Sequence, residues 1–411
     1  MSSLPEVEFT LTNLVYGGDA LGRDSDGRAI FVPFALPGEQ VRARLVEEKT
    51  HHAQAELVKI LNPAPERIEP RCSHFTVCDG CHYQHMPYAS QLSAKTAILK
   101  EQLERIGGMS DIPILPAVSS PIEWFYRNHI QFHLTPQGKL GFRKPRSEEV
   151  LAIRECYLPE EALNTLWPQL EIEPLPGLER IGLRSGADGD LMLVLESREL
   201  QPPELSVEGL PLSVVHLSPD GTLVLAGSDH IFMDILDRSL RLSAGSFFQV
   251  NTPMAPRMVE HLLENLPLTG ASTLLEVYCG VGLFSAFLAP RVGRLVGVES
   301  LPDACVDFIA NLDEFDNVEL YEDDAKRALP QLELHPDIVL VDPPRAGLER
   351  PVMDAILQMQ PAALAYVSCD PATLARDARR LKVGGYSLKR ITLFDLFPQT
   401  YHIESISFWE R

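Results

Sequence analysis

Residues 274–283 have the sequence LLEVYCGVGL, in which a short apolar segment is followed directly by a turn with two glycines. This pattern is typical of a buried β-strand that leads through a tight turn into a helix. Short apolar segments of this kind lie at Thr273–Val277, 294–298, 337–341 and 363–367, and helical patterns separate them. Such alternation predicts a mainly parallel sheet flanked by helices. We therefore expect an α/β, Rossmann-like domain in residues 241–411.

The glycine-rich turn marks a candidate cofactor site. Gly280 and Gly282 let a ligand approach the backbone at the carboxyl edge of the strands, where doubly wound sheets bind nucleotides. The second strand ends in Glu299, nineteen residues after Gly280. A carboxylate there can accept hydrogen bonds from both ribose hydroxyls. These features suit S-adenosylmethionine (SAM) and NAD about equally, and a tight turn without a ligand is the alternative.

A proline-containing segment favours one of these two cofactors over the other. Strand 337–341 ends in Asp342-Pro343-Pro344-Arg345. Consecutive prolines fix the chain in an extended turn, which would hold Asp342 beside the reactive end of the cofactor. The tetrapeptide resembles one that is typical of SAM-dependent methyltransferases acting on planar, nitrogen-bearing rings. A proline-capped turn is the alternative, and we expect SAM.

Cys369 stands at the corresponding position of the next strand, within SCDPATLARD at 368–377. A helix is expected to begin near Pro371, and its N-terminus can favour the thiolate of a cysteine placed just before it. That is the setting of a nucleophile. A lone cysteine is usually a core residue, which is our interpretation of Cys279 and Cys305. The neighbouring DPPR segment favours catalysis by Cys369.

Together these motifs resemble the catalytic domain of the SAM-dependent uracil-5 RNA methyltransferases, which form 5-methyluridine in rRNA or tRNA. The resemblance implies a class I methyltransferase domain. It spans nearly the whole chain, with two small departures: Asp370 replaces the usual Asn, and Leu283 stands where Asn is frequent. The matching motifs are FFQVN at 247–251, EVYCGVGL at 276–283, Glu299, DPPR at 342–345, SCDPATLARD at 368–377 and DLFPQTYHIE at 395–404.

The resemblance also implies a mechanism and a set of site residues. Cys369 is expected to attack carbon 6 of uracil, and carbon 5 then takes the methyl group of SAM. Glu404 is the carboxylate expected to remove the carbon 5 proton. Our own hypothesis is that Arg345 stabilises the developing oxyanion. The implied SAM ligands are Gln249, Tyr278, Gly280, Gly282, Glu299 and Asp342, with Asp324 as a further candidate at the adenine end.

Residues 1–62 have a different pattern, with alternating apolar and polar positions and glycine-containing turns. Short strands at this spacing predict a small β-barrel, and Asn62-Pro63-Ala64-Pro65 is interpreted as its linker. The segment resembles the TRAM domain, an OB-like RNA-binding barrel; another small β module is the alternative. The predicted domains are this barrel at 1–62, a central α+β domain with a cysteine cluster at 63–240, and the methyltransferase domain at 241–411.

The central domain contains a helical pattern at 86–106 and a set of cysteines. Cys72, Cys78 and Cys81 have the spacing C-x5-C-x2-C, and Cys156 is a plausible fourth ligand. Four thiolates suit tetrahedral zinc or an iron–sulfur cluster, and the spacing alone does not decide between them. The resemblance to rRNA-modifying members favours a [4Fe–4S] cluster, with zinc as the alternative.

The distribution of charge along the chain indicates which class of partner the protein can bind. The net charge of −21, from 36 Lys and Arg against 57 Asp and Glu, argues against a simple basic nucleic-acid binder and against an anionic membrane surface. Residues 124–147 nevertheless contain no acid, and five aromatic residues, including Tyr126 and Phe132, lie among their basic ones. Such a stretch suits single-stranded RNA, with two ordinary strands and a basic turn as the alternative. The basic residues are Arg127, Lys139, Arg143, Lys144 and Arg146.

The expected protein is therefore a monomeric, cytoplasmic RNA methyltransferase without a membrane segment. Its expected substrate is 23S rRNA, and tRNA is the alternative. A non-catalytic RNA-binding iron–sulfur protein is a rival interpretation, which Cys369 and Glu404 disfavour. An NAD-dependent oxidoreductase is disfavoured by DPPR. An enzyme that methylates a base nitrogen would have no use for Cys369.

Overall fold

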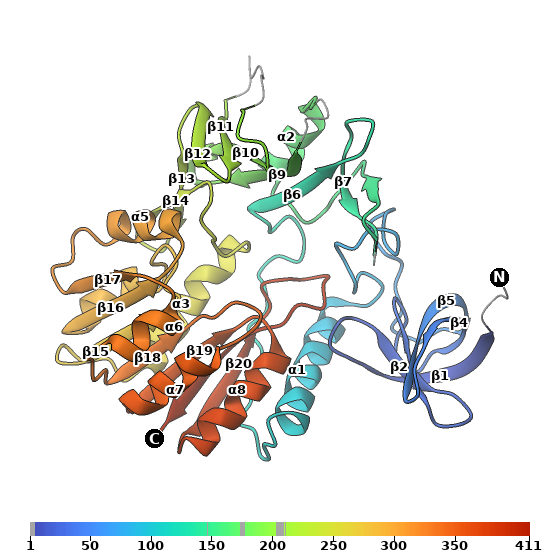
Figure 1. Ribbon diagram of the computed structural model, residues 1–411. Coiled ribbons are helices and arrows are strands. Elements are labelled where there is room, and N and C mark those ends of the chain that lie inside the picture. The colour runs from blue at the N-terminus through green and yellow to red at the C-terminus, as the bar shows by residue number, and fades with distance from the viewer. Residues whose placement is uncertain (1–4, 146, 173–176, 203–208, 210) are drawn as a thin grey trace. The chain divides into compact units, whose positions relative to one another are not determined.

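The computed structural model describes residues 5–145, 147–172, 177–202, 209 and 211–411. The chain forms two compact units (Figure 1). The first, here called the barrel unit, consists of Met1–Glu101, Phe142–Glu155 and Phe397–His402. The second, the sheet unit, consists of Gln102–Gly141, Cys156–Leu396 and Ile403–Arg411. The predicted division into three domains stays a prediction.

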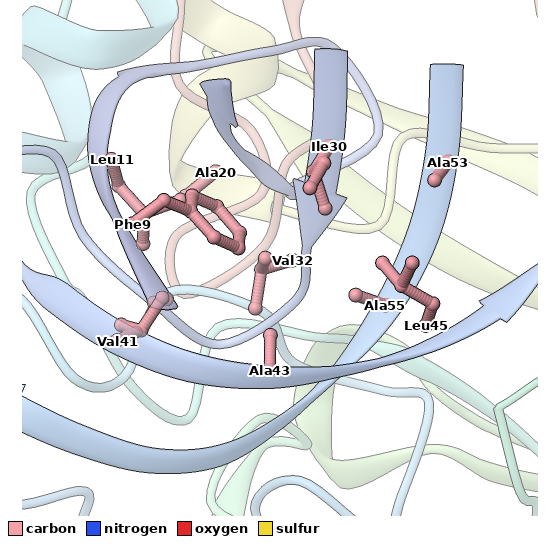
Figure 2. Packing of buried hydrophobic residues seen from close by; sticks show 11 residues of the cluster. Phe9, Leu11, Ala20, Ile30, Val32, Val41, Ala43, Leu45, Ala53 and Ala55 are labelled. Atoms are coloured by element: carbon pink, nitrogen blue, oxygen red, sulfur yellow. The ribbon is translucent and has the colours of Figure 1, made fainter. Parts of the chain in front are cut away.

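The barrel unit begins with the closed five-stranded barrel that the alternating pattern predicts. Its strand order is β1-β2-β3-β5-β4. Figure 2 shows Phe9, Ile30, Val32 and Leu45 pointing into the barrel, where all four are at most 7% exposed. Alternate residues of each strand thus form the core. The strands are β1 (Glu6–Leu14), β2 (Ala20–Arg23), β3 (Ala29–Val32), β4 (Gln40–Glu48) and β5 (His52–Asn62).

The proline-rich segment after β5 is packed, which corrects its interpretation as a linker. Ala64 is 6% exposed and belongs to a small core cluster with Leu36 and Tyr83. The buried carboxylate of Glu39 accepts hydrogen bonds from the Ala64 and Leu36 N–H groups. It also pairs with Arg67 at 2.6 Å. A buried carboxylate needs such partners, so Glu39 fixes the segment against the barrel.

The helix predicted at 86–106 is α1 (Tyr88–Arg105), which begins in the barrel unit and ends in the sheet unit. It buries apolar residues such as Leu99 and Leu103 and also three polar ones, Gln91, Lys95 and Gln102. A short strand, β8 (Val150–Ala152), lies in the barrel unit. Among the described residues, no helix is long and apolar enough to cross a membrane.

The sheet unit contains a first, largely antiparallel sheet in which β12, β11, β10, β9, β6 and β7 are neighbours in that order. A separate hairpin, β13 with β14, follows it along the chain. The elements are β6 (His129–Leu134), β7 (Leu140–Arg143), α2 (Glu161–Leu166), β9 (Leu178–Ser185), β10 (Leu191–Ser197), β11 (Ser213–Ser218), β12 (Gly221–Ala226), β13 (His230–Ile235) and β14 (Arg238–Ser243).

The second sheet of this unit has the order β17-β16-β15-β18-β19-β21-β20, in which the first five strands are parallel. Its central strands are almost entirely apolar, as in sheets covered on both faces, and Glu276 of β15 is an exception. Helices α7 and α8 run along the face turned towards the reader in Figure 1. The strands are β15 (Thr273–Val277), β16 (Arg294–Glu299), β17 (Val318–Glu322), β18 (Ile338–Val341), β19 (Ala363–Ser368), β20 (Ser387–Phe394) and β21 (Glu404–Glu410). The helices are α3 (Ala255–Asn265), α4 (Ser285–Leu288), α5 (Pro302–Asn311), α6 (Ala325–Ala328), α7 (Arg350–Met359) and α8 (Pro371–Val383).

Candidate active site

The candidate site lies at the carboxyl edge of the parallel strands. Asp342 directly follows β18, and Cys369 directly follows β19. Strand β21 is antiparallel to β19, with Ser405 opposite Ser368. The first residue of β21, Glu404, therefore lies at the same edge as the last residues of the parallel strands. The sheet topology brings Cys369 and Glu404 together, although 35 positions separate them in the sequence.

The glycine-rich turn after β15 has positive φ angles, which glycine adopts without strain. Gly280 and Gly282 have φ angles of +54° and +87°. A Cβ on Gly282 would lie 2.5 Å from Leu312, whereas no atom lies within 4 Å of a Cβ on Gly280. Gly282 is thus required by packing, and the space beside Gly280 is open. Glu299 accepts a hydrogen bond from the Gly280 N–H at 3.0 Å and so holds the turn.

Two carboxyl groups with raised pKa values belong to this part of the sheet, the half-buried Asp342 and the buried Glu276. Burial raises the pKa of Asp342 to about 7. Glu276, in the middle of β15, is 1% exposed, and burial raises its pKa to about 8, with the charge of Asp342 adding to the rise. The Ser285 hydroxyl donates to Glu276 at 2.5 Å and partly offsets this. Sequence reasoning missed Glu276, although an acid inside an apolar strand was a usable signal.

Cys369 carries a protonated thiol in this environment. Its pKa is raised to about 12, mainly by burial; the negative charges of Glu404 and Asp342 add to the rise, and Arg345 opposes it. The expectation that the N-terminus of α8 favours the thiolate is wrong here. Asp370 caps that helix by accepting hydrogen bonds from the N–H groups of Ala372 and Thr373 at 3.0 and 2.8 Å. The Asp at this position therefore has a structural role.

Burial also disfavours the ionised form of Glu404. Glu404 is 4% exposed, and burial together with the negative charge of Asp342 raises its pKa well above the usual range of a glutamate. Arg345 acts in the opposite direction. Cys369, Glu404, Asp342 and Arg345 thus influence one another electrostatically. Such a group of mutually perturbed side chains at a sheet edge is a candidate catalytic centre.

The loop that carries Asp342 and Arg345 is held by α8. Arg376 donates to the carbonyl oxygens of Ala346 and Leu348 at 2.9 and 3.2 Å. Asp377, which is fully buried, accepts hydrogen bonds from the Leu348 N–H at 2.8 Å and the Tyr366 hydroxyl at 3.0 Å, and pairs with Arg376. Thr373 donates to the carbonyl of Arg345 at 3.1 Å. The sequence motif contained these three residues, but their positioning role required the structure.

Comparisons with known proteins identify the family. A family model described as tRNA (Uracil-5-)-methyltransferase matches residues 206–325 and 328–411, and a TRAM-domain model matches residues 6–58. The chain is 33% identical to an uncharacterized RNA methyltransferase of Halalkalibacterium halodurans, over 98% of this chain and 96% of the relative. An uncharacterized RNA methyltransferase of Aquifex aeolicus is 34% identical over 98% of both chains. The chain belongs to the uracil-5 RNA methyltransferase family.

A solved structure has the same fold as this uracil-5 RNA methyltransferase. It is the tRNA (uracil-54, C5)-methyltransferase of Pyrococcus abyssi in complex with S-adenosyl-L-homocysteine. The TM-score is 0.74 with 24% sequence identity, and the match covers 98% of this chain and 100% of the other. The predicted fold class, a class I methyltransferase domain with an N-terminal TRAM barrel, is confirmed.

The residues expected to bind SAM in this family lie at successive strand ends. Tyr278, Glu299 and Asp342 follow or end β15, β16 and β18, which are neighbours in the sheet. Burial raises the pKa of Tyr278 to about 12. Asp324 lies beyond β17 and caps α6, and a hydrogen bond from the Lys326 N–H lowers its pKa. Gln249 is 6% exposed in the segment between β14 and α3.

The cysteines predicted to bind metal are not assembled into a metal site. Cys72, Cys78 and Cys81 are half-buried in the barrel unit, and Cys156 belongs to the sheet unit. The Cys72 and Cys78 sulfurs each accept a backbone N–H hydrogen bond at 3.4 Å. Within the part of the chain that the structure describes, no three His, Cys, Asp or Glu side chains form a group that could hold a metal ion. The metal site stays a prediction.

The predicted RNA-contact stretch is less basic and less aromatic on its surface than in sequence. Tyr126 and Phe132 are fully buried, which corrects their expected role as stacking surfaces. Arg143 pairs with Glu148 at 2.9 Å and Lys144 with Glu149 at 2.5 Å. These two acids directly follow the acid-free stretch 124–147, so the composition of that stretch does not include them. Lys139 is exposed and Arg127 half-buried, while Arg146 lies outside the described residues.

Proposed function

We propose that this chain converts a uridine of RNA to 5-methyluridine with SAM as methyl donor. The observation that carries the proposal is the assembly of Cys369, Glu404, Asp342 and Arg345 at one sheet edge. A thiol nucleophile, a carboxyl base and a guanidinium are the groups that this chemistry requires. Family membership supplies the substrate class.

The reaction follows from the electronic structure of uracil. Carbon 5 is a poor nucleophile until a group has added to carbon 6, and the Cys369 thiolate makes that addition. The negative charge then develops on the ring oxygen, where the Arg345 guanidinium stabilises it. SAM, when bound, supplies an electrophilic methyl group to carbon 5. The Glu404 carboxylate finally takes the carbon 5 proton, the bond between sulfur and carbon 6 breaks, and the thiolate leaves.

The protonation states of the free protein fit a site that is activated by its ligands. Asp342 raises the pKa of both Cys369 and Glu404 through its negative charge. A cation beside Asp342 offsets this charge and lowers both values. SAM carries a positive sulfonium. We therefore infer that SAM binding converts the Cys369 thiol and the Glu404 carboxyl towards their reactive, ionised forms.

The proposed cofactor and substrate residues lie around this edge. Tyr278, Gly280, Gly282, Glu299 and Asp342 are proposed to bind SAM, with Gln249 and Asp324 as further ligands. Phe247, two residues before Gln249, is 67% exposed. An exposed aromatic ring suits stacking on a base that has been turned out of its helix. Lys139 and Arg127 are proposed to contact RNA phosphates.

The RNA class has two candidates. We propose 23S rRNA, because the cysteine set resembles that of rRNA-modifying members. The description of the matching family model names tRNA as the substrate. The solved structure from Pyrococcus abyssi is described as a tRNA (uracil-54, C5)-methyltransferase. These descriptions make tRNA the second candidate. Mapping 5-methyluridine in rRNA and tRNA from cells with and without this gene distinguishes the two, since only the true substrate loses its modification.

We further propose that Cys72, Cys78, Cys81 and Cys156 hold a [4Fe–4S] cluster, with zinc as the alternative. Backbone N–H groups that donate to the Cys72 and Cys78 sulfurs stabilise thiolates, as metal ligation requires. The cluster would have no redox role, since methyl transfer moves no electrons. Anaerobically purified protein should contain iron and sulfide and absorb near ~400 nm. Colourless protein with stoichiometric zinc would support the alternative.

The catalytic proposal is tested with purified protein and an RNA that carries the mapped uridine. Cys369→Ala should retain SAM binding and lose turnover by about a thousandfold or more. Glu404→Gln should form a covalent protein–RNA adduct that survives on a denaturing gel. Full activity of Cys369→Ala would exclude the mechanism.

A further inference from the structure

The segment between β20 and β21 leads directly into Glu404. Within it, Phe397–His402 belongs to the barrel unit, and its contacts described here lie inside that unit. Gln399 has a φ of +69°, a left-handed conformation that is strained for a residue with a side chain. Strained backbone persists only where the surroundings hold it. The residues that hold Gln399 are therefore candidates for a positioning role.

Gln91 of α1 holds Gln399 through both ends of its side-chain amide. Its carbonyl oxygen accepts a hydrogen bond from the Gln399 N–H at 2.9 Å, and its NH2 group donates to the Gln399 side chain at 3.0 Å. The same NH2 group is near the Tyr83 and Met86 carbonyls at 3.3 and 3.2 Å. Gln91 and Gln399 are 1% and 2% exposed. In a buried site, such hydrogen bonds are costly to lose.

Further hydrogen bonds also fix the position of this segment. The Gln399 carbonyl accepts hydrogen bonds from the His82 and Tyr83 N–H groups at 2.8 and 3.0 Å. Lys95, one helical turn after Gln91, donates to the Phe397 carbonyl at 2.9 Å. Gln91 is distinct among these contacts because a side-chain substitution removes both of its bonds to Gln399.

The segment beyond Gln399 is short and internally bonded. Thr400 donates to the Phe397 carbonyl through its N–H at 3.2 Å and its hydroxyl at 2.9 Å. The Thr400 hydroxyl oxygen accepts a hydrogen bond from the His402 N–H at 3.2 Å. Ile403 is 1% exposed, and Glu404 follows it. Only five positions separate Gln399 from Glu404, which is itself paired with Phe394 of β20.

We propose that Gln91 is a positioning residue for Glu404, acting through the left-handed backbone of Gln399. The inference rests on the proposed function, in which Glu404 removes the carbon 5 proton. Without Gln91, the Gln399 backbone relaxes and Glu404 moves away from the proton it must accept. Addition of Cys369 and methyl transfer precede that step and depend on other groups. Loss of Gln91 therefore slows elimination selectively.

The test compares Gln91→Ala with wild type and with Ser93→Ala, an exposed position on the same helix. Protein, SAM and substrate RNA are mixed, and methylated RNA and denaturant-stable adduct are followed in a single turnover. We expect Gln91→Ala to accumulate about tenfold more adduct than wild type, with methyl transfer within about threefold. Ser93→Ala should behave as wild type. Thermal unfolding checks that each variant is folded.

A second pair of variants keeps the test decisive if Gln91→Ala folds poorly. Gln399→Gly removes the side-chain bond but accepts a positive φ without strain and keeps the N–H bond to Gln91, so it should fold and partition as wild type does. In the double variant Gln91→Ala/Gln399→Gly, glycine keeps the left-handed backbone without Gln91, so the amount of adduct should fall back towards the wild-type level. A structural defect alone would lower the rate of every step in proportion to the folded fraction, and it would not increase the share of RNA present as adduct.

The outcomes separate this inference from the proposed function. If wild type makes 5-methyluridine and Glu404→Gln traps adduct, the function stands. If Gln91→Ala then partitions as wild type does, or if the double variant accumulates as much adduct as Gln91→Ala, the positioning role is overturned. If Glu404→Gln traps nothing and wild type methylates no uridine, the proposed function itself has failed.

Discussion

Two loops bring the proposed catalytic groups to the same sheet edge, and they are held in different ways. The first, 342–348, carries Asp342 and Arg345 and is held by α8, with Arg376 bonded to Ala346 thirty positions away. The second, 395–403, leads to Glu404, and Gln399 is bonded to Gln91 308 positions away. The first loop is secured by its own neighbourhood, whereas the second depends on a distant part of the chain.

This difference matches the order of the proposed chemistry. The first loop serves addition and methyl transfer, which need Asp342 and Arg345 in place. The second serves the final proton removal by Glu404. Separate supports allow each step to be disturbed alone, so variants in the two loops should fail in different ways. If variants in the two loops slowed the same step, the two loops would not serve separate steps.

The largest effect is expected from Asp377→Ala in the support of the first loop. The change leaves the buried Leu348 N–H and Tyr366 hydroxyl without their acceptor and removes the partner of Arg376. We expect the free energy of unfolding in urea to fall by about 3–5 kcal/mol. Arg380→Ala is the control, because Arg380 reaches Asp377 only at 3.5 Å. A loss below ~1 kcal/mol for Asp377→Ala would show that α8 does not secure the loop.

A smaller effect is expected from Gly347→Ala in the same loop. Gly347 has a φ of +71°, and a Cβ would lie 2.6 Å from both Arg376 and Asp377. We expect a loss of about 2–3 kcal/mol in unfolding free energy and a slower methyl transfer. Gly385→Ala isolates the backbone strain, since its φ is +92° and nothing lies within 4 Å of a Cβ there. Equal losses in the two variants would mean that the contacts with α8 do not matter.

The sequence predicted the framework of the site well. The strands expected at Thr273–Val277, 294–298, 337–341 and 363–367 are β15, β16, β18 and β19, with bounds that differ by one residue at most. Buried parallel strands are continuous apolar runs, so their limits are sharp in sequence. The helix expected near Pro371 begins there, because Asp370 and proline form a strong helix start.

The details that control reactivity could not be predicted. The pKa of Cys369 depends on Glu404 and Asp342, which the fold brings near it from other strands. The pairing of Gln91 with Gln399 leaves no local signal, since a glutamine in a helix and a glutamine in a loop are both ordinary. Tyr126 and Phe132 were assigned to a surface because aromatic residues among basic ones resemble an RNA site, and only tertiary packing decides which rings are buried.

The alkylation rate of Cys369 reports how strongly the charged group carried by each loop changes the pKa of this thiol. Its pKa is raised to about 12, with Glu404 a larger cause than Asp342. Removing either negative charge lowers that pKa and increases the thiolate fraction at a fixed pH below it. At pH ~9, alkylation of Cys369 should be several-fold faster in Glu404→Gln than in wild type, and less accelerated in Asp342→Asn.

Peptide-resolved mass spectrometry separates Cys369 from the other six cysteines, and the buried Cys279 serves as an internal control. If Asp342→Asn accelerated alkylation more than Glu404→Gln, the first loop would be the stronger influence on the thiol. Unchanged rates in both variants would show that burial alone sets the pKa of Cys369.

The smallest effects are expected from two matched threonine substitutions, one in each support. Thr373→Val removes the hydrogen bond to the Arg345 carbonyl, and Thr400→Val removes the bonds to Phe397 and His402. Valine keeps the shape of threonine, so each should cost only about 1 kcal/mol in unfolding free energy. The kinetic defects should nevertheless differ: slower methyl transfer without adduct for Thr373→Val, and more adduct at a normal transfer rate for Thr400→Val. Because the two changes are chemically identical, opposite kinetic signatures can arise only from the loop that each one loosens.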